Sequence, residues 1–423
     1  MKKKIMYLVA VALVLTACSS EEPITPQNQV NDAMGANPYR VSLTDALKNA
    51  DALLGELCED EVTRSIERKV ESVEYYSRPG TRALGGDTLL YLVNYADDAG
   101  FALLSADSRL RPIYAISDEG SMSFSDTTYN KGLALFARGV EAEIVNYLIL
   151  PGDTLIFNPP TGPEQDFFAD SIKRVKDRVR PMLSMYQRNW NQDAPFNEYC
   201  FTDDGEQALV GCTAVAVAQI MAYHKWPEQY GGYTFDWDEI NNGNIDMLAR
   251  FLSVLGDENN LRISYGASDS PASRTRYYPT FLNMGYSCHS DLIPFEENDI
   301  CAFLKGTYST DYPATPLLVN GNHPTSNGHG WVIDGFVQYQ YTKVVVPPIT
   351  TFDDILYHCV WGWGGCNNGY YYWAKNNRFD PEIIEKDRYD NYDGDPYNFT
   401  YYNNNKYIVG FVPQRSNKKM NLI

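Results

Sequence analysis

Cys212 has the surroundings of a reactive thiol. It stands near the start of an Ala-rich segment, residues 211–224, whose composition predicts a helix ending before Pro227. The first amides of a helix lack partners within it and the helix dipole is positive there, so both favour a thiolate. A thiolate attacks carbonyl carbon atoms, and Gly211 leaves room for a substrate backbone. The alternative is that Cys212 is a small buried residue of an apolar helix.

Such a nucleophile needs a base, and the chain has five histidines. His224 lies on the same predicted helix, about 18 Å from Cys212 at 1.5 Å per residue, which is too far. His329 has glycines on both sides and precedes an apolar run that predicts a strand able to hold its ring. The remaining histidines lie in polar loops or in another predicted strand: His289, His323 and His358.

Asp334 is a tempting third member of this group. It follows His329 by five residues, and an odd separation along a strand places two side chains on opposite faces. We therefore exclude Asp334 as the carboxylate that orients His329.

The elements that would position the pair fall into two parts. Residues 41–157 predict a small α+β domain, with helices and short strands at 42–57, 89–93, 100–105, 113–116 and 131–148. Residues 181–423 predict a second domain that is helical first and then β. Its expected strands are 316–320, 329–336, 341–347, 355–361 and 369–373.

Residues 158–180 predict a linker between the two domains. The run from Lys173 to Arg180 is basic in an otherwise acidic chain. Two interpretations are open: a solvated helix face, or an exposed segment between domains that is open to proteolysis.

The N-terminus predicts export. Three lysines precede the apolar run 5–15, which is too short to span a bilayer. The run ends in Leu-Thr-Ala before Cys18, which resembles the lipobox of bacterial lipoproteins. That resemblance implies a signal peptide over 1–17, lipidation of Cys18 and a tether over 18–40. We expect an exported lipoprotein of the bacterial outer membrane, facing the periplasm or the cell surface; a plain secretory signal is the alternative.

Composition excludes some partners and leaves others open. The net charge of −19 over 423 residues argues against nucleic-acid binding. Seven cysteines remain after Cys18, so at least one is unpaired within the chain. The aspartates of the loop 387–405 lack EF-hand spacing, so a hydrated loop is favoured over a calcium site.

Three sequence blocks carry a resemblance to a known family. They are the block from Gly211 to Pro227, the block Gly-His-Gly-Trp-Val-Ile-Asp-Gly over 328–335, and Tyr-His-Cys-Val-Trp-Gly-Trp-Gly-Gly over 357–365. In order and spacing they resemble the signature blocks of the streptopain family of cysteine peptidases. Residues 100–107 and 112–115 are similar to the inhibitory propeptide of that family, which also exists as a free inhibitor domain.

The resemblance implies an α+β fold: a papain-like peptidase domain of two lobes, preceded by the propeptide that blocks it until it is removed. It also implies that the linker 158–180, with its basic segment, is the activation site. Cys212 matches the nucleophile, His329 the general base and Gln192 the amide that donates to the oxyanion. Gly211 and Trp361 are supporting residues. Relatives usually have Asn where this chain has Val360, so the expected orienting amide is absent and we expect reduced or differently tuned activity. Packing by Trp361 and a backbone carbonyl are the remaining ways to hold the imidazole.

We therefore expect a cysteine endopeptidase made as an inactive zymogen, with protein or peptide substrates and no cofactor or metal. Its own propeptide would be an intramolecular inhibitor. The alternative, suggested by Val360, is a weakened or inactive homologue that acts as a surface binding or inhibitor protein.

Overall fold

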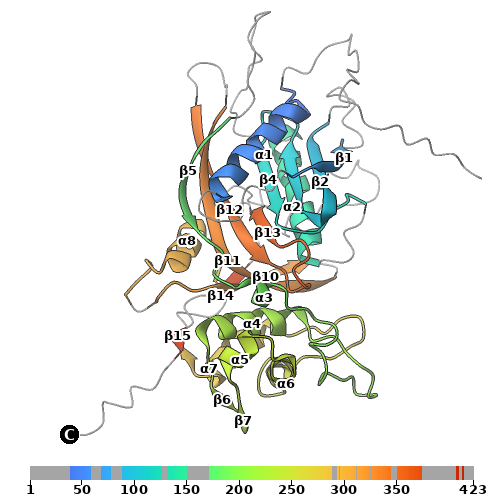
Figure 1. Cartoon of the computed structure of the whole chain (residues 1–423), viewed down its shortest axis with the longest axis vertical. Coiled ribbons are helices and arrows are strands. Elements are labelled where there is room, and N and C mark those ends of the chain that lie inside the picture. The colour runs from blue at the N-terminus through green and yellow to red at the C-terminus, as the bar shows by residue number, and fades with distance from the viewer. Residues whose placement is uncertain are drawn as a thin grey trace, which may run out of the picture. The chain divides into compact units, whose positions relative to one another are not determined.

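A computed structural model provides the structure of the chain (Figure 1). It describes residues 39–58, 68–77, 88–125, 131–149, 171–287, 293–294, 296–310, 312–323, 326–343, 350–373, 406–408 and 412–413. These residues belong to one compact unit, Asn37–Ile423. Below, the N-terminal part means the described residues up to 149, and the C-terminal part means those from 171 onward. Cys18, the signal peptide, the tether up to residue 38 and the 387–405 loop lie outside the described residues.

Both parts of the chain contain helices and strands. The helices are α1 (Leu43–Cys58), α2 (Lys131–Ile149), α3 (Met185–Arg188), α4 (Cys212–His224), α5 (Trp237–Asn241), α6 (Ile245–Gly256), α7 (Tyr277–Asn283) and α8 (Glu297–Lys305). The strands are β1 (Val70–Tyr76), β2 (Leu90–Tyr95), β3 (Phe101–Ser105), β4 (Ile113–Ser117), β5 (Ser171–Val179), β6 (Gln229–Tyr230), β7 (Tyr233–Thr234), β8 (Tyr286–Ser287), β9 (Ile293–Pro294), β10 (Leu317–His323), β11 (Ser326–Lys343), β12 (Thr350–Val360), β13 (Gly369–Tyr372), β14 (Lys406–Ile408) and β15 (Val412–Pro413).

One antiparallel sheet runs through both parts of the chain. Its described strands follow the order β1-β2-β3-β4-β13-β12-β11-β10-β14-β9, and β5 also pairs with β11. The join is the pair β4–β13, in which Tyr370 lies opposite Ile116. The N-terminal part therefore extends the sheet of the C-terminal part by hydrogen bonds between strands.

Alternation of side chains along the strands gives this sheet two apolar faces. On one face, Leu90 and Leu92 of β2 join a core that includes α2, α8 and the indoles of Trp331 and Trp361. On the other face, Tyr91 and its neighbours pack under α1. Each face thus buries residues from both parts of the chain, which favours one joint fold over two loosely tethered domains.

The helices α4 to α7 form a separate layer with its own core. Helix α4 is apolar all round, with Thr213 to Ala222 buried, because it packs against α6 on one side and against β10 and β11 on another (Figure 1). Leu318, Val332 and Val360 supply the sheet side of this core. The start of α4 is consequently fixed against β11, where His329 lies.

Most of the predicted elements are confirmed. The helices predicted at 42–57, 131–148 and 211–224 are α1, α2 and α4 within two residues, and the first three predicted strands are β2, β3 and β4. The segments 329–336 and 341–347 were expected to be separate strands, but β11 runs unbroken from Ser326 to Lys343. No helix of the described residues has the length and apolar character that crossing a membrane requires.

The prediction for the basic run needs a correction. Residues 171–179 are neither a helix nor an exposed linker; they form β5, which pairs with β11 from Phe336 to Thr342. Two apolar residues of this segment, Ile172 and Val175, pack beneath α1, while Arg174 and Lys176 are exposed to solvent. Pairing with β11, which is interrupted by two register shifts, is what makes this charged segment a strand.

Candidate active site

Cys212 is the first residue of α4, and Gly211 is the cap before it. The backbone of Gly211 has φ of 92°, a region that favours glycine. A Cβ at this position would lie 2.5 Å from the main-chain oxygen of Ser270. The space expected to admit a substrate backbone is therefore filled on one side by the protein itself, and Gly211 is needed to let the chain enter the helix.

The Cys212 thiol is set apart from the other described cysteines by its acidity. Burial raises its pKa, but the charge and hydrogen bonding of His329, the Gly330 amide and Thr213 outweigh burial and lower the pKa to about 7. The Gly330 amide donates to Sγ at 3.4 Å. A pKa near 7 leaves a large thiolate fraction at neutral pH.

The remaining described thiols have raised pKa values. Burial is the main cause in each case, and for Cys301 the pKa rises to about 12. The others are Cys200, Cys359 and Cys366. All five of these described cysteines, Cys212 included, are free thiols. Among these five thiols, Cys212 is thus the one whose surroundings favour a nucleophile.

The hydrogen bonding of His329 fixes its tautomer. Nε2 lies 3.0 Å from the main-chain oxygen of Trp361, and because a carbonyl only accepts, Nε2 must carry the proton. Nδ1 is buried without an oxygen or nitrogen partner among the described residues. In the neutral ring Nδ1 is therefore a proton acceptor, and the group on which the imidazole acts is the Cys212 thiol. This arrangement can transfer a proton from sulfur to His329 and back.

A short loop holds the carbonyl that orients His329. The Trp361 amide donates to Asn368 Oδ1 at 3.0 Å, and its indole Nε1 donates to the Asn367 oxygen at 2.8 Å. The Trp361 side chain is fully buried, with its ring 6.1 Å from that of His329. The Trp331 ring stacks with the imidazole, also at 6.1 Å, and lies 5.4 Å from the Trp361 ring. The imidazole is therefore held by one hydrogen bond and two indole rings.

Val360 does not face the histidine in place of the expected amide. It is fully buried in the core of α4 to α7, where it pairs with Val332 across the strands. Asp334 does not contact His329 either: its carboxylate accepts from His358 Nδ1 at 2.6 Å and from the Leu183 amide at 3.0 Å.

Gln192 lies beside the chain that leads into Cys212. The Val210 amide donates to the Gln192 main-chain oxygen at 3.0 Å. This bond fixes Gln192 against Val210, which precedes the nucleophile by two residues. The side-chain Nε2 of Gln192 donates to the Gly362 oxygen at 3.3 Å, and only 3% of the residue is exposed. An amide nitrogen has two hydrogens, so this bond leaves one donor for a second acceptor.

A buried polar chain, which the sequence alone did not reveal, connects the two catalytic candidates. The Thr213 hydroxyl lies 3.0 Å from the Tyr277 hydroxyl, which accepts from Asn320 Nδ2 at 3.3 Å. The same Asn320 nitrogen lies 3.3 Å from the main-chain oxygen of His329. The chain joins α4, α7, β10 and β11 and so ties the residue next to Cys212 to the backbone of His329. Only the position of Thr213 beside the cysteine could have signalled it.

Helix α2 of the N-terminal part begins directly over this site. A Cβ on Gly132 would overlap the six-membered ring of Trp361 and come within 2.7 Å of His329 Cδ2. Lys131 Nζ binds Asp269 Oδ1 at 2.9 Å, on the loop that packs against Gly211. The first turn of α2 therefore contacts both sides of the candidate site.

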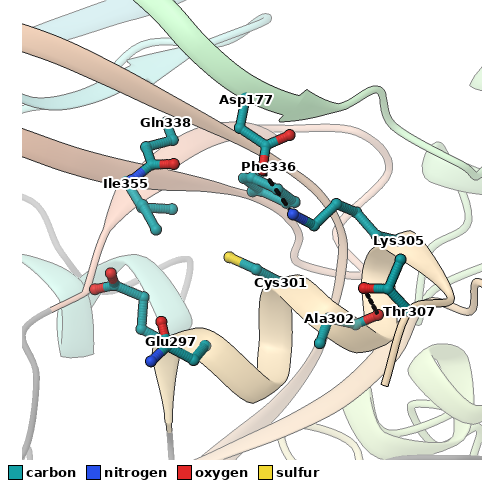
Figure 2. Close-up of a pocket in the computed structure, with 10 residues that line it drawn as sticks. Asp177, Glu297, Cys301, Ala302, Lys305, Thr307, Phe336, Gln338 and Ile355 are labelled. Atoms are coloured by element: carbon teal, nitrogen blue, oxygen red, sulfur yellow. Dashed lines mark hydrogen bonds and ion pairs between the residues drawn. The ribbon is translucent and has the colours of Figure 1, made fainter. Parts of the chain in front are cut away.

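A small hollow elsewhere on the C-terminal part is not connected with this site. Figure 2 shows it between α8 and the sheet, with Cys301, Glu297 and Lys305 on the helix side. Its volume is about 170 Å³. Lys305 Nζ crosses it to Asp177 Oδ2 at 2.6 Å and fastens β5 to α8. Among the described residues, no group of three or more His, Cys, Asp or Glu side chains is arranged to hold a metal ion.

Comparison with known proteins agrees with this architecture. Residues 190–371 match the Peptidase C10 family, and residues 42–144 match the Spi protease inhibitor family. The thiol protease/hemagglutinin PrtT of Porphyromonas gingivalis is 24% identical over 68% of this chain, which covers 34% of PrtT. Streptopain of Streptococcus pyogenes is 23% identical over 68% of this chain and 75% of its own length.

Two solved structures from Prevotella intermedia are also similar. A fragment of prointerpain A covers 80% of this chain and 98% of its own, with a TM-score of 0.46 and 18% identity. Active interpain A covers 46% of this chain and 86% of its own, with a TM-score of 0.32 and 23% identity. The family matches, with thiol proteases among the relatives, show that the chain has a Peptidase C10 region over residues 190–371, preceded by a Spi-type inhibitor region over residues 42–144.

Proposed function

We propose that the chain is an endopeptidase in which Cys212 is the nucleophile and His329 the general base and acid. The thiolate of Cys212 attacks the peptide carbonyl carbon and forms a tetrahedral intermediate. The imidazolium of His329 then gives its Nδ1 proton to the leaving amine, and water releases the acyl group with His329 as base. The observation that supports this most is the Nε2–Trp361 hydrogen bond, because it presents Nδ1 as the proton acceptor.

Two donors suit the charge that develops on the carbonyl oxygen. One is the amide of Cys212, at the first position of α4, where helix amides lack intrahelical partners. The other is the free N–H of the Gln192 side chain. A preset donor of this kind contributes about 3 kcal/mol to the stability of the transition state.

The N-terminal part would keep the precursor inactive. Helix α2 occupies the side of the site formed by His329 and Trp361, and Lys131 bridges to the side formed by the loop at Asp269. A substrate needs the same space. Activation therefore requires cleavage of the chain and displacement of α2.

The cellular location is a proposal from the sequence. The lipobox-like segment before Cys18 supports export and lipidation, with the enzyme anchored to the bacterial outer membrane and digesting proteins at that surface. Replacement of Cys18 by Ser, followed by metabolic labelling with a radioactive fatty acid and cell fractionation, tests it. We expect loss of the label and release of the protein from the membrane; a label that persists would contradict lipidation at Cys18.

A binding or inhibitor protein without turnover was the alternative suggested by Val360. Its motivation was the missing amide, but His329 has the Trp361 carbonyl as its partner and the pKa of Cys212 is lowered. Both features favour the enzyme. The test is casein digestion by the full-length chain after maturation, with Cys212→Ala as the matched control: we expect digestion and loss of precursor only when Cys212 is present.

A further inference from the structure

His358 is a buried histidine that the proposed reaction does not use. It lies on β12 and is fully buried. Nδ1 is 2.6 Å from Asp334 Oδ1 and Nε2 is 2.9 Å from Asp118 Oδ2. Ionised carboxylates only accept, so both ring nitrogens donate and the ring is an imidazolium.

The two carboxylates come from different regions of the chain. Asp334 belongs to β11 of the peptidase region and is fixed by the amide of Leu183. Asp118 directly follows β4 of the inhibitor region, and its amide donates to the Asn368 oxygen at 2.7 Å. Asn368 is the residue whose side chain holds the Trp361 amide. The contact at His358 thus adjoins the loop that orients the catalytic histidine.

A second cation completes the surroundings of Asp118. Arg188 Nη1 lies 3.5 Å from Asp118 Oδ2, and its side chain is 17% exposed. Within the peptidase region, one negative charge on Asp334 stands against the positive charges of His358 and Arg188. The excess is one positive charge, which the carboxylate of Asp118 neutralises. A carboxylate is therefore the group that this position fits.

We propose that His358 and Arg188 form a carboxylate-binding subsite on the peptidase region, and that Asp118 is the side chain by which the inhibitor region is recognised and held there. This inference rests on the proposed role of the N-terminal part as inhibitor. It assigns the subsite a partner of defined chemistry: an inhibitor domain with an acidic side chain after the strand that pairs with β13. In the uncleaved chain that partner is the chain's own residues 42–144.

The subsite depends on the charge of His358. Burial lowers the pKa of His358, but the charges and hydrogen bonds of Asp334 and Asp118 outweigh burial and raise the pKa to about 9. Loss of Asp118 removes part of that effect, so binding of the inhibitor region favours the protonated ring. The contribution of His358 to binding of the inhibitor region is fully present at pH values below the pKa that His358 has without Asp118. It is lost as the pH rises through about 9, the pKa in the bound state.

Asp118 sets the acidic limit of this contact. Burial raises its pKa, but the hydrogen bond and charge of His358, with the charges of Arg188 and Arg68, outweigh burial and lower it below its usual range. The contact is therefore lost only when pH falls through that lowered pKa. The other titratable groups nearby are Tyr370, whose ring lies 5.1 Å from that of His358 and whose pKa is raised by burial, and Glu119, whose pKa is raised by burial and by Asp118.

The first test reads the charge of His358 without any peptidase activity. The measurement is NMR of the full-length Cys212→Ala chain with ¹⁵N-labelled histidines. The signals that disappear in the His358→Gln variant are those of His358. We expect both ring nitrogens of His358 to carry protons at pH 8, and the pKa of His358 to fall when Asp118→Asn is added. A neutral His358 at pH 7.5 would overturn the proposal. Because Cys212 is absent, this result does not depend on the proposed reaction.

The second test measures how well the inhibitor region protects Cys212 in the full-length chain that retains this cysteine. We expect Asp118→Asn to increase the rate of iodoacetamide labelling of Cys212 in uncleaved precursor at least tenfold at pH 7, since close charge pairs at interfaces have large coupling energies. Asp118→Glu should restore much of the protection. Asp45→Asn is the matched control, because Asp45 pairs with Lys48 inside the inhibitor region. Equal labelling rates of wild type and a folded Asp118→Asn variant would overturn the proposal. If that variant does not fold, the labelling rate of Arg188→Gln and the charge of His358 from the first test take its place.

Discussion

His329 donates a hydrogen bond from Nε2 to the main-chain oxygen of Trp361 at 3.0 Å. The family pattern places an amide side chain one residue earlier, where this chain has Val360. A main-chain oxygen cannot be removed by substitution, and here it is held by the bonds of Trp361 to Asn367 and Asn368. The orienting contact of the imidazole is thus built into the loop rather than into one side chain.

Restoring the family's asparagine should not improve the enzyme. Val360 is fully buried in the apolar core beneath α4, so Val360→Asn places an unpaired amide there. We expect a loss of about 1 to 3 kcal/mol in the free energy of unfolding and no gain in kcat/KM above twofold. Urea unfolding and peptide hydrolysis measure the two quantities, and Val360→Ala separates lost packing from the buried amide. A severalfold rise in kcat/KM would show that His329 lacks an adequate partner.

The hydroxyl of Thr213 should set part of the acidity of Cys212. Its hydrogen bond is one of the influences that lower the thiol pKa to about 7. Thr213→Val removes the hydroxyl at nearly constant shape, so the thiol pKa should rise by about 0.5 to 1 unit, as expected for a hydrogen bond of about 1 kcal/mol. The rate at which iodoacetamide labels matured enzyme rises with pH as the Cys212 thiol ionises, so this rise, the acid limb of the pH profile, should move to higher pH. Thr213→Ser should restore the wild-type profile; an unchanged limb in Thr213→Val would rule out this role.

Latency should depend on the absence of a side chain at Gly132. Gly132→Ala puts a methyl group into the Trp361 ring and against His329, so α2 must move away from the site. We expect faster maturation of the full-length precursor and earlier labelling of Cys212, by about tenfold or more, with a lower melting temperature of the precursor. Gly55→Ala in α1 is the control, because nothing lies within 4 Å of its added Cβ. If both variants mature at the wild-type rate, α2 does not restrain the site.

The activation cut should fall outside β5. A protease needs an extended substrate with free backbone groups, but β5 is paired with β11 from Phe336 to Thr342, and Asp177 is bound to Lys305 (Figure 2). N-terminal sequencing of matured enzyme should therefore give a start no later than Ser171 or a start after Val179, even though the basic run offers several lysines and arginines. A start between residues 172 and 179 would contradict this.

Local sequence patterns were enough to predict most of the elements. Helices α1 and α2 follow from apolar spacing and α4 from its Ala-rich composition, with a Pro after α2 and after α4. Strands β2 to β4 follow from short apolar runs between turn residues. Strand β5 was missed because its charges suggested solvent on all sides. Its place is decided by long-range pairing with β11, which no local pattern encodes.

The sequence could predict the residues of the site but not their partners. Cys212 and His329 stand in recognisable surroundings, whereas the carbonyl of Trp361 is a backbone group that every residue possesses. The contacts of Thr213 with Tyr277 and of His358 with Asp118 join positions 64 and 240 residues apart, so only the folded chain reveals them. His358 was set aside as a strand residue for that reason.

The central claim is that Cys212, activated by His329, cleaves peptide bonds. The most direct measurement is mass spectrometry of peptides released from denatured casein by matured enzyme and by the Cys212→Ala and His329→Ala chains, each matured by an added protease. We predict peptide release by the wild type alone, with iodoacetamide modifying Cys212 before any other thiol at pH 7. Peptides released by matured Cys212→Ala at the wild-type rate would contradict the account.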